Sequence, residues 1–317
     1  MSKRPESVGE YTTRQGILPS KPHLLGMLTR MKTRLPWSTQ LLILGIESLP
    51  SFTLEPLARL MAFGYRTLAP RKLRRAIRNL EIAFGDQLDP TEIDLLARKS
   101  LVHQAIALLE SIRELRKPGA VQIEGFAGIQ SLAKELEQGE GGQLFLTAHI
   151  GAWEFVNRAG TQAATGDFFA LAKEPKQESA NLLLDHLRES GGMEVLPSGR
   201  KSTLKRMLEV LKRGGWLGLA MDQKPDGPGI PVEFFGRTTE FVVGPAALIE
   251  RQGSRALVAF CIRLGNGKYR LLGQKLLLTG GESRQEITQK MASLVEDVIR
   301  QHPEQWLWTY RRWPDVR

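Results

Sequence analysis

The chain has 317 residues, 42% of them hydrophobic, so it can bury a core of domain size and disorder does not dominate it. Its single cysteine, Cys261, lies in an apolar run, which excludes a disulfide framework and predicts an inert buried thiol. No run of about 18 uncharged apolar residues exists and the first residues lack the apolar core of a secretory signal, so neither a transmembrane span nor a signal peptide is predicted.

The net charge of +10 is concentrated toward the start of the chain, where residues 1–120 contain 19 Lys and Arg against 11 Asp and Glu. This excess indicates an acidic partner: a nucleic acid backbone, an anionic membrane surface or an acidic carrier protein. No nucleic acid partner is expected, because residues 65–85 offer only two aromatic side chains for base stacking. The densest basic cluster, which a solvated helical face also explains, consists of Arg71, Lys72, Arg74, Arg75 and Arg78.

The chain is predicted to have three parts. Residues 1–22 are polar and contain three prolines, which indicates a flexible tail. Residues 23–117 show helical periodicity and are predicted to form a helical region that associates with a membrane. Residues 118–317 alternate short apolar runs with helical stretches, which is typical of an α/β domain.

Two segments of the helical region suggest a membrane surface. Leu24–Leu35 predicts an amphipathic basic helix, and Trp37–Leu49 predicts an apolar helix that is too short to span a bilayer. A helical pair packed on the domain is an alternative explanation of both segments. From Leu54 to Leu115 the pattern stays helical, with breaks at Pro70 and Pro90.

The remaining part is predicted to be α/β, with a mixed, mostly parallel sheet flanked by helices. Strands are predicted at residues 121–124, 144–148, 168–173, 194–196, 216–221, 232–235, 256–263 and 269–278. Helices are predicted at residues 128–137, 153–164, 177–189, 202–212, 244–252 and 284–301.

His149 and Glu154 are the first candidate catalytic residues. His149 lies at the carboxyl end of a predicted buried strand. Open α/β sheets have their active sites at this edge. Five residues at about 100° each would put the two side chains on different faces of one helix. His149 should therefore lie in a turn that Gly151 permits, with Glu154 in the first turn of the following helix. A hydrogen-bonded core histidine and a carboxylate at a helix dipole explain the pair as well.

Common catalytic signatures are missing from the chain. It contains no Gly-x-Ser-x-Gly elbow, no phosphate loop and no Gly-x-Gly-x-x-Gly after a strand, and its one cysteine and five scattered histidines predict no metal site and no cofactor. What is left is a histidine with a nearby carboxylate and no protein nucleophile. Such a pair can take a proton from a substrate hydroxyl, which then attacks an activated acyl group directly.

At this point the residues resemble a known family. His-Ile-Gly-Ala-Trp-Glu, residues 149–154, is similar to the His-x-x-x-x-acid motif of glycerolipid-type acyltransferases, in the form found in bacterial lipid A late acyltransferases. The likeness covers roughly residues 35–313. Its other matching segments are Arg78-Asn79-Leu80, Ala83-Phe84-Gly85, Met221-Asp222-Gln223, Phe234-Phe235-Gly236-Arg237, Gly244-Pro245-Ala246, Gln305-Trp306, Trp308 and Arg311-Arg312-Trp313.

The resemblance implies roles for particular side chains. His149 would be the general base and Glu154 would orient and charge its imidazole. Lys173, Arg188 and Arg237 would bind a lipid phosphate or phosphopantetheine. Lys173 stands where the family usually shows an arginine. Ordinary surface ion pairs explain these cations as well. Asp222 would hold one of the arginines or cap a turn.

The resemblance also implies a reaction and a location. A fatty acyl group would move from an acyl thioester, either on acyl carrier protein or on coenzyme A, to a hydroxyl of a lipid A-type or other glycolipid acceptor. The protein would work as a peripheral enzyme at the cytoplasmic face of the bacterial inner membrane. Two alternatives remain open: an acyl-CoA-dependent lysophospholipid or glycolipid acyltransferase, and a membrane-binding module without catalytic activity.

Overall fold

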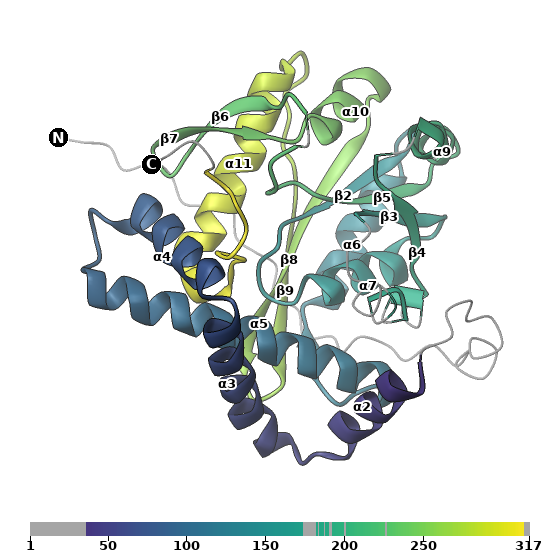
Figure 1. Ribbon diagram of the computed structural model, residues 1–317. Helices are drawn as coiled ribbons and strands as arrows, with labels where there is room; N and C mark the ends of the chain where they lie inside the picture. The colour runs from purple at the N-terminus through teal and green to yellow at the C-terminus, as the bar shows by residue number, and fades with distance from the viewer. Residues whose placement is uncertain are drawn as a thin grey trace.

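The computed structural model describes residues 36–173, 182, 184–186, 188–189, 192–199, 201–225 and 227–313 (Figure 1). The predicted tail at residues 1–22 and the predicted basic helix at residues 24–35 lie outside the described residues, as does most of the predicted helix at residues 177–189. None of the helices in the described ranges is long and apolar enough to cross a membrane.

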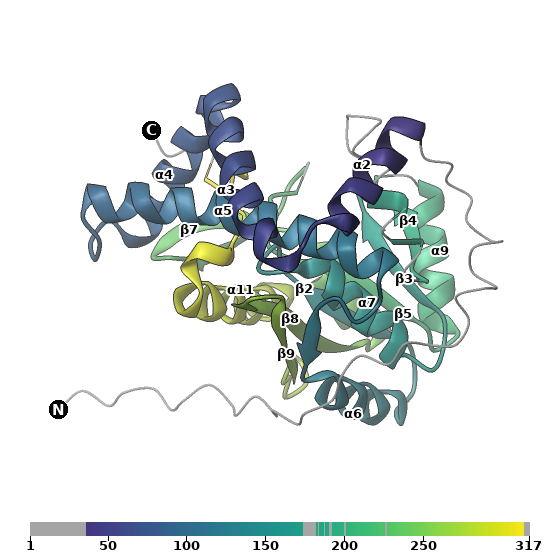
Figure 2. The ribbon, with the colours of Figure 1, turned by 90° about the horizontal axis from the view of Figure 1, so that it is seen from below.

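Four helices precede the sheet. They are α2 (Trp37–Ser48), α3 (Ser51–Leu68), α4 (Pro70–Phe84) and α5 (Pro90–Arg116). Both predicted breaks are confirmed, because Pro70 and Pro90 take the first helical position, where a missing N–H costs nothing. Asp89 caps α5 in a reciprocal arrangement with Glu92. Figures 1 and 2 show α2 and α3 meeting at an angle against α5, on the side away from the sheet.

The α/β class and the mostly parallel sheet are confirmed. Seven strands form one sheet in the order β1-β9-β8-β2-β5-β3-β4. Within this sheet β8 and β9 pair antiparallel, and the other neighbouring strands pair parallel. The strands of this sheet are β1 (Gln122–Glu124), β2 (Gln143–Thr147), β3 (Phe168–Ala172), β4 (Glu194–Pro197), β5 (Trp216–Ala220), β8 (Arg255–Gly265) and β9 (Lys268–Lys275).

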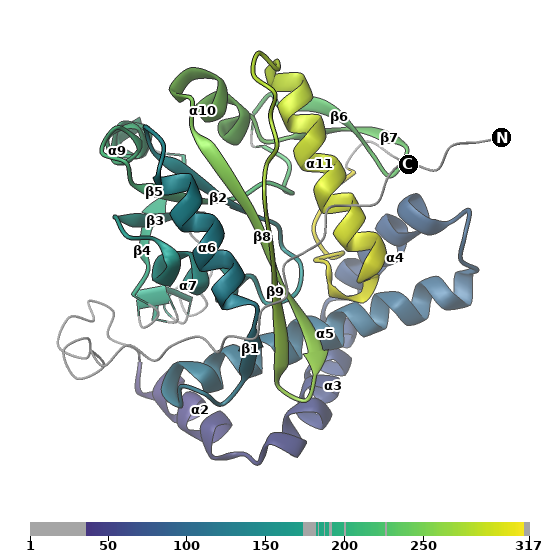
Figure 3. The same ribbon diagram turned by 180° about the vertical axis from the view of Figure 1, so that it is seen from behind.

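Helices cover both faces of the sheet (Figures 1 and 3). One face packs against α6 (Phe126–Glu137) and α7 (Trp153–Ala163), and the other against α9 (Lys201–Lys212), α10 (Gly244–Gln252) and α11 (Arg284–Gln301). Burial on both faces explains why the central strands are continuous apolar runs without alternation. The hydrophobic core between the sheet and α9, α10 and α11 also contains Trp306 and Trp308, which follow the short 3-10 helix η1 (Pro303–Gln305).

The hairpin of β6 (Ile230–Phe234) and β7 (Arg237–Phe241) forms a separate two-stranded sheet. No strand was predicted at β7, because its residues are mostly polar. Its two-residue loop, Phe235-Gly236, has positive φ at both residues, where such hairpins usually carry Asn-Gly. Phe235 is held in this unfavourable conformation by ring contacts with Phe84 and Trp308 and by a backbone N–H donated to Glu296.

Candidate active site

The turn between β2 and α7 places His149 where the sequence predicted it, after a fully buried strand, with Glu154 as the second residue of α7. Gly151 makes this turn possible. Its φ is +62°, and a Cβ there would lie 2.0 Å from the carbonyl oxygen of Cys261. The turn is fixed on both sides: Gly151 N–H donates to Gln305 and Ala152 N–H donates to Cys261. Cys261 itself is a buried free thiol whose pKa burial raises, as expected for an inert side chain.

Asp222 reaches the histidine because β2 and β5 are neighbouring parallel strands. Thr147 is paired with Ala220, so His149 and Asp222 each lie two residues beyond a paired position, at the same edge of the sheet. Met221 N–H donates to the Thr147 carbonyl and extends the pairing to that point. Strand register, and not proximity in the sequence, therefore brings these two side chains together.

Asp222 is the carboxylate that orients the imidazole in the structure. Its Oδ1 lies 2.8 Å from His149 Nδ1, and its Oδ2 accepts from the His149 backbone N–H at 3.0 Å and from Trp306 Nε1 at 2.8 Å. The side chain is buried, and these three donors satisfy it. Because Asp222 accepts at Nδ1, the neutral histidine carries its proton there and leaves Nε2 as the basic nitrogen.

The two side chains shift each other's pKa in opposite directions. Burial lowers the pKa of His149, but the charge and hydrogen bond of Asp222, with a contribution from Glu154, outweigh burial and raise it above its usual value. Burial raises the pKa of Asp222, but the charge and hydrogen bonds of His149 and the bond from Trp306 lower it overall. The pair thus strengthens the base while the carboxylate stays ionised.

The basic nitrogen faces a second polar side chain. His149 Nε2 lies 3.3 Å from Gln223 Nε2, so the amide of Gln223 can donate to it. The imidazole keeps 20% of its surface exposed and contacts the ring of Trp153 edge-on, with 5.3 Å between ring centroids. An incoming hydroxyl that displaces the Gln223 amide would meet the unprotonated Nε2 of an imidazole that the bond from Nδ1 to Asp222 holds in place.

Glu154 bonds to an arginine. Arg188 donates to both of its carboxylate oxygens, the shorter contact being 3.1 Å from Arg188 Nη2 to Glu154 Oε1, and the two side chains are only 13% and 15% exposed. Among the described residues, the ring of His149 bonds to Asp222 and Gln223 and not to Glu154. Glu154 therefore acts on His149 through its charge and holds Arg188 at the same turn.

The other two candidate cations are placed differently. Lys173 directly follows β3, whose pairing with β5 puts its carboxyl end at the same edge of the sheet as Asp222. Arg237 begins β7 in the separate hairpin, is exposed, and is not among the hydrogen-bond partners of His149 in the described part of the chain. The structure thus brings Arg188 and Asp222 to the histidine, places Lys173 at the same edge, and leaves Arg237 on the hairpin.

The sequence did not identify Trp306 and Gln223 as site residues. Trp306 is buried, and the segment that carries it packs along the histidine turn, since Leu307 N–H donates to the His149 carbonyl. Trp306 lies 84 residues after Asp222, and this distance in the sequence hides the hydrogen bond between them. Gln223 directly follows Asp222, and its signal in the sequence was its place in the matching segment Met221-Asp222-Gln223.

We expect Glu154 and Arg188 to be coupled in stability. A buried ion pair that loses one partner leaves the other charge uncompensated, so Glu154→Gln and Arg188→Ala should each destabilise the fold. The double variant should lose less than the sum, with a coupling free energy of about 0.5–3 kcal/mol. Urea unfolding of the four proteins measures this coupling. Purely additive losses would contradict the pair.

The fold and the site together define a class: a mostly parallel α/β protein with an oriented, basic histidine at the carboxyl edge of its sheet and a carboxylate behind it. Residues 26–315 match the family of bacterial lipid A biosynthesis acyltransferases. The chain belongs to this family, as the resemblance in its sequence predicted.

Curated relatives are phosphatidylinositol mannoside acyltransferases. The protein of Mycobacterium tuberculosis (strain ATCC 25618 / H37Rv) is 30% identical over 188 residues, which cover 59% of this chain and 58% of the relative. That of Mycolicibacterium smegmatis (strain ATCC 700084 / mc(2)155) is 28% identical over 187 residues, covering 58% of this chain and 60% of the relative. The matches therefore span about three fifths of these relatives.

Proposed function

We propose that this protein transfers a fatty acyl group from an acyl thioester to a hydroxyl of a glycolipid, with His149 as general base. The single observation that carries this proposal is the hydrogen bond from His149 Nδ1 to Asp222, which leaves Nε2 basic at the sheet edge of a chain in this family. The relatives support the substrate class, since their names give acylation of phosphatidylinositol mannosides.

The proposed mechanism needs no covalent intermediate on the protein. His149 Nε2 takes the proton of the acceptor hydroxyl while the hydroxyl oxygen attacks the thioester carbonyl carbon and forms a new C–O bond. The tetrahedral intermediate then breaks the C–S bond, and the departing thiolate takes the proton from the imidazolium. Asp222 stabilises the imidazolium and holds the ring in place through both steps.

The cations at the site offer contacts for the substrates. Arg188, anchored by Glu154, presents a planar guanidinium that suits a phosphate, and Lys173 adds a point charge at the same edge. We propose that they hold the phosphate of a phosphopantetheine arm or of the acceptor lipid. Acyl carrier protein is the proposed donor and coenzyme A the alternative.

The helices α2 and α3 support a location at a membrane surface. All but four of the large exposed apolar side chains in the described part of the chain lie on these two helices, including Trp37 (76% exposed), Phe52 (80%) and Leu68 (88%). An apolar patch of this kind on short helices suits the headgroup boundary of a bilayer. We propose that the protein lies on the cytoplasmic face of the bacterial inner membrane.

The proposal is tested with the purified chain, radiolabelled lauroyl thioesters of acyl carrier protein and of coenzyme A, and two acceptors, a lipid A precursor and phosphatidylinositol mannoside. Acyl transfer to a glycolipid hydroxyl, abolished in His149→Ala, is the expected result. Transfer at the parent rate in His149→Ala would overturn the general-base role. Vesicle binding without any transfer by the parent protein would favour a membrane-binding module.

We expect the apolar patch to drive vesicle binding. Combining Leu41→Ser, Phe52→Ser and Leu60→Ser should lower partitioning onto phospholipid vesicles at least about tenfold, since each buried apolar side chain contributes about 1.5–3 kcal/mol. The matched control changes three exposed leucines elsewhere: Leu95→Ser, Leu204→Ser and Leu277→Ser. Vesicle sedimentation measures both proteins. Equal partitioning of the two would show that α2 and α3 do not face the membrane.

A further inference from the structure

The four arginines of the basic cluster form one face of α4. Its arginines at positions 71, 74, 75 and 78 follow the spacing of residues that share a helix face. The opposite face packs into the core through Ala76, Leu80 and Ala83. The arrangement therefore places four guanidinium groups along one side of α4.

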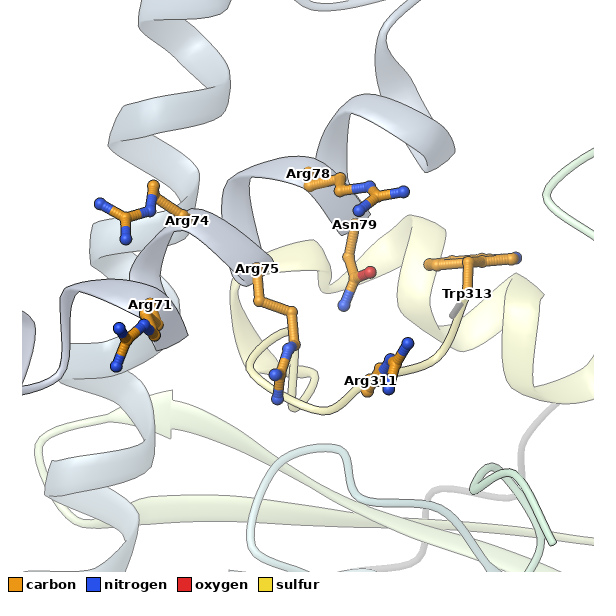
Figure 4. Close-up of a pocket in the computed structure, with 7 residues that line it drawn as sticks. All are labelled: Arg71, Arg74, Arg75, Arg78, Asn79, Arg311 and Trp313. Atoms are coloured by element: carbon orange, nitrogen blue, oxygen red, sulfur yellow. The ribbon is translucent and has the colours of Figure 1, made fainter. Parts of the chain in front are cut away.

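A pocket of about 290 Å³ lies between this face and the C-terminal segment. Figure 4 shows Arg75 and Arg78 extending from α4 toward the side of Arg311 and Trp313, with Arg71 and Arg74 farther along the same helix. The pocket is built by a fixed contact, because Asn79 donates to the carbonyls of Trp308 and Tyr310 at 2.8 and 2.7 Å and ties the segment to α4. The pocket is lined by Arg71, Arg74, Arg75, Arg78, Asn79, Arg311 and Trp313.

Within the described ranges, none of these five arginines pairs with a carboxylate. Arg75 donates to the carbonyl of Thr309 at 3.4 Å, and Nη2 of Arg78 is buried without a hydrogen-bond partner. Elsewhere on the molecule arginines do find carboxylates, as Arg158 does with Glu114 and Arg263 with Glu110. Five like charges around one hollow repel one another, and an anion bound between them removes that cost.

The position of the pocket indicates the source of the anion. The helix α4 begins at Pro70, directly after the exposed end of α3 at Leu68, so the arginines adjoin the apolar patch proposed to lie on the membrane. The guanidinium fork matches phosphate oxygens in pairs. A concave site of this volume suits a headgroup, whereas a folded acidic helix would reach only its rim.

We infer that the α4 arginine pocket is a binding site for the phosphate headgroup of an anionic membrane lipid, separate from the acyl-transfer site. Apolar contact by α2 and α3 would bring the protein to the bilayer, and the phosphate in the pocket would fix its orientation. This inference rests on the membrane location proposed above and does not depend on acyl transfer.

The test compares two triple variants that each remove three positive charges. The pocket variant combines Arg71→Gln, Arg74→Gln and Arg311→Gln, all at exposed side chains. The control combines Lys205→Gln, Lys212→Gln and Arg213→Gln, exposed residues at α9 on the far side of the molecule. Sedimentation with phosphatidylcholine vesicles, with and without phosphatidylglycerol, measures the gain in binding that the anionic lipid gives.

The pocket variant should lose this gain at least about tenfold, while the control keeps it within about twofold, because the bound phosphate and not net charge sets it. A third variant with lysine in place of the same three arginines keeps the charge but loses the fork, and we expect it to bind several-fold more weakly. Equal losses in the pocket and control variants, or no gain with the parent protein, would overturn the inference.

Two further ligands separate the sources of the anion. Dihexanoyl phosphatidylglycerol should bind the parent protein in calorimetry more tightly than inorganic phosphate at equal ionic strength. Tighter binding of inorganic phosphate would overturn the lipid assignment. A pocket variant that loses acyl carrier protein but keeps vesicles would assign the pocket to an acidic protein and also overturn it. Vesicle binding needs no turnover, so a parent protein that binds vesicles without transferring acyl groups would contradict only the proposed enzyme.

Discussion

Replacing His149 with alanine should lower kcat for acyl transfer by about 10²–10⁴-fold, the range that a positioned general base contributes. The substitution removes Nε2, the nitrogen that accepts the proton in the proposed mechanism, which stays unprotonated because Nδ1 is bonded to Asp222 and which lies beside Gln223. KM for the thioester should change little, because the imidazole has no ground-state role in holding the donor. Steady-state kinetics with a labelled acyl thioester measures both constants.

A matched control separates this loss from damage to the fold. His149→Gln keeps a polar side chain of similar length that can still donate toward Asp222, yet offers no basic nitrogen. It should be as inactive as His149→Ala while its melting temperature stays closer to that of the parent protein. An active His149→Gln variant would mean that another group accepts the proton.

Asp222→Asn should cost about as much as the loss of the base itself, because it reverses the tautomer. Two N–H donors, the His149 backbone and Trp306 Nε1, face Oδ2, so the amide oxygen of the new asparagine must take that place. Its NH2 then points at His149 Nδ1, which has to accept and moves the ring proton to Nε2. In comparable His–Asp pairs such a reversal costs on the order of 10⁴ in kcat.

The same variant should also shift the pH dependence of kcat/KM. The reaction needs neutral His149, so activity falls as pH drops through the pKa of the imidazole, which Asp222 raises above its usual value. Without the charge of Asp222, burial dominates and lowers that pKa. The acid limb of the profile should therefore move to lower pH in Asp222→Asn, even though the maximum rate is much smaller.

Glu154→Gln provides the control for this pH shift. Glu154 contributes to the raised pKa of His149 only through its charge, and its hydrogen bonds go to Arg188. Its acid limb should move less than that of Asp222→Asn, and its kcat should fall less. A larger shift in Glu154→Gln than in Asp222→Asn would return the orienting role to Glu154.

The choice between these two carboxylates shows where sequence reasoning stops. The sequence favours Glu154, because it lies five residues after the histidine in a motif typical of the family. Asp222 was assigned to an arginine or a turn, because 73 residues separate it from His149. The two residues are close in space because β2 and β5 are neighbouring strands of the sheet. The sequence of one strand does not indicate which other strand will pair with it.

The hairpin of β6 and β7 shows the same limit at the level of local structure. Its turn contains Phe235 in place of a residue that favours positive φ. Ring contacts with Phe84 and Trp308 and the backbone hydrogen bond to Glu296 hold Phe235 there. Tertiary contacts here override a local preference that argues against the turn.

The sequence by itself determined the parts that depend on short-range chemistry. Hydrophobic runs defined most strands of the sheet, prolines set the starts of α4 and α5, and Gly151 allowed the turn that presents His149, because each effect acts within a few residues. The tertiary structure alone decided which carboxylate meets the imidazole, that Trp306 supports it, and that four arginines of α4 line one pocket together with Arg311. These contacts join residues far apart in the chain, and only strand order and helix packing bring them together.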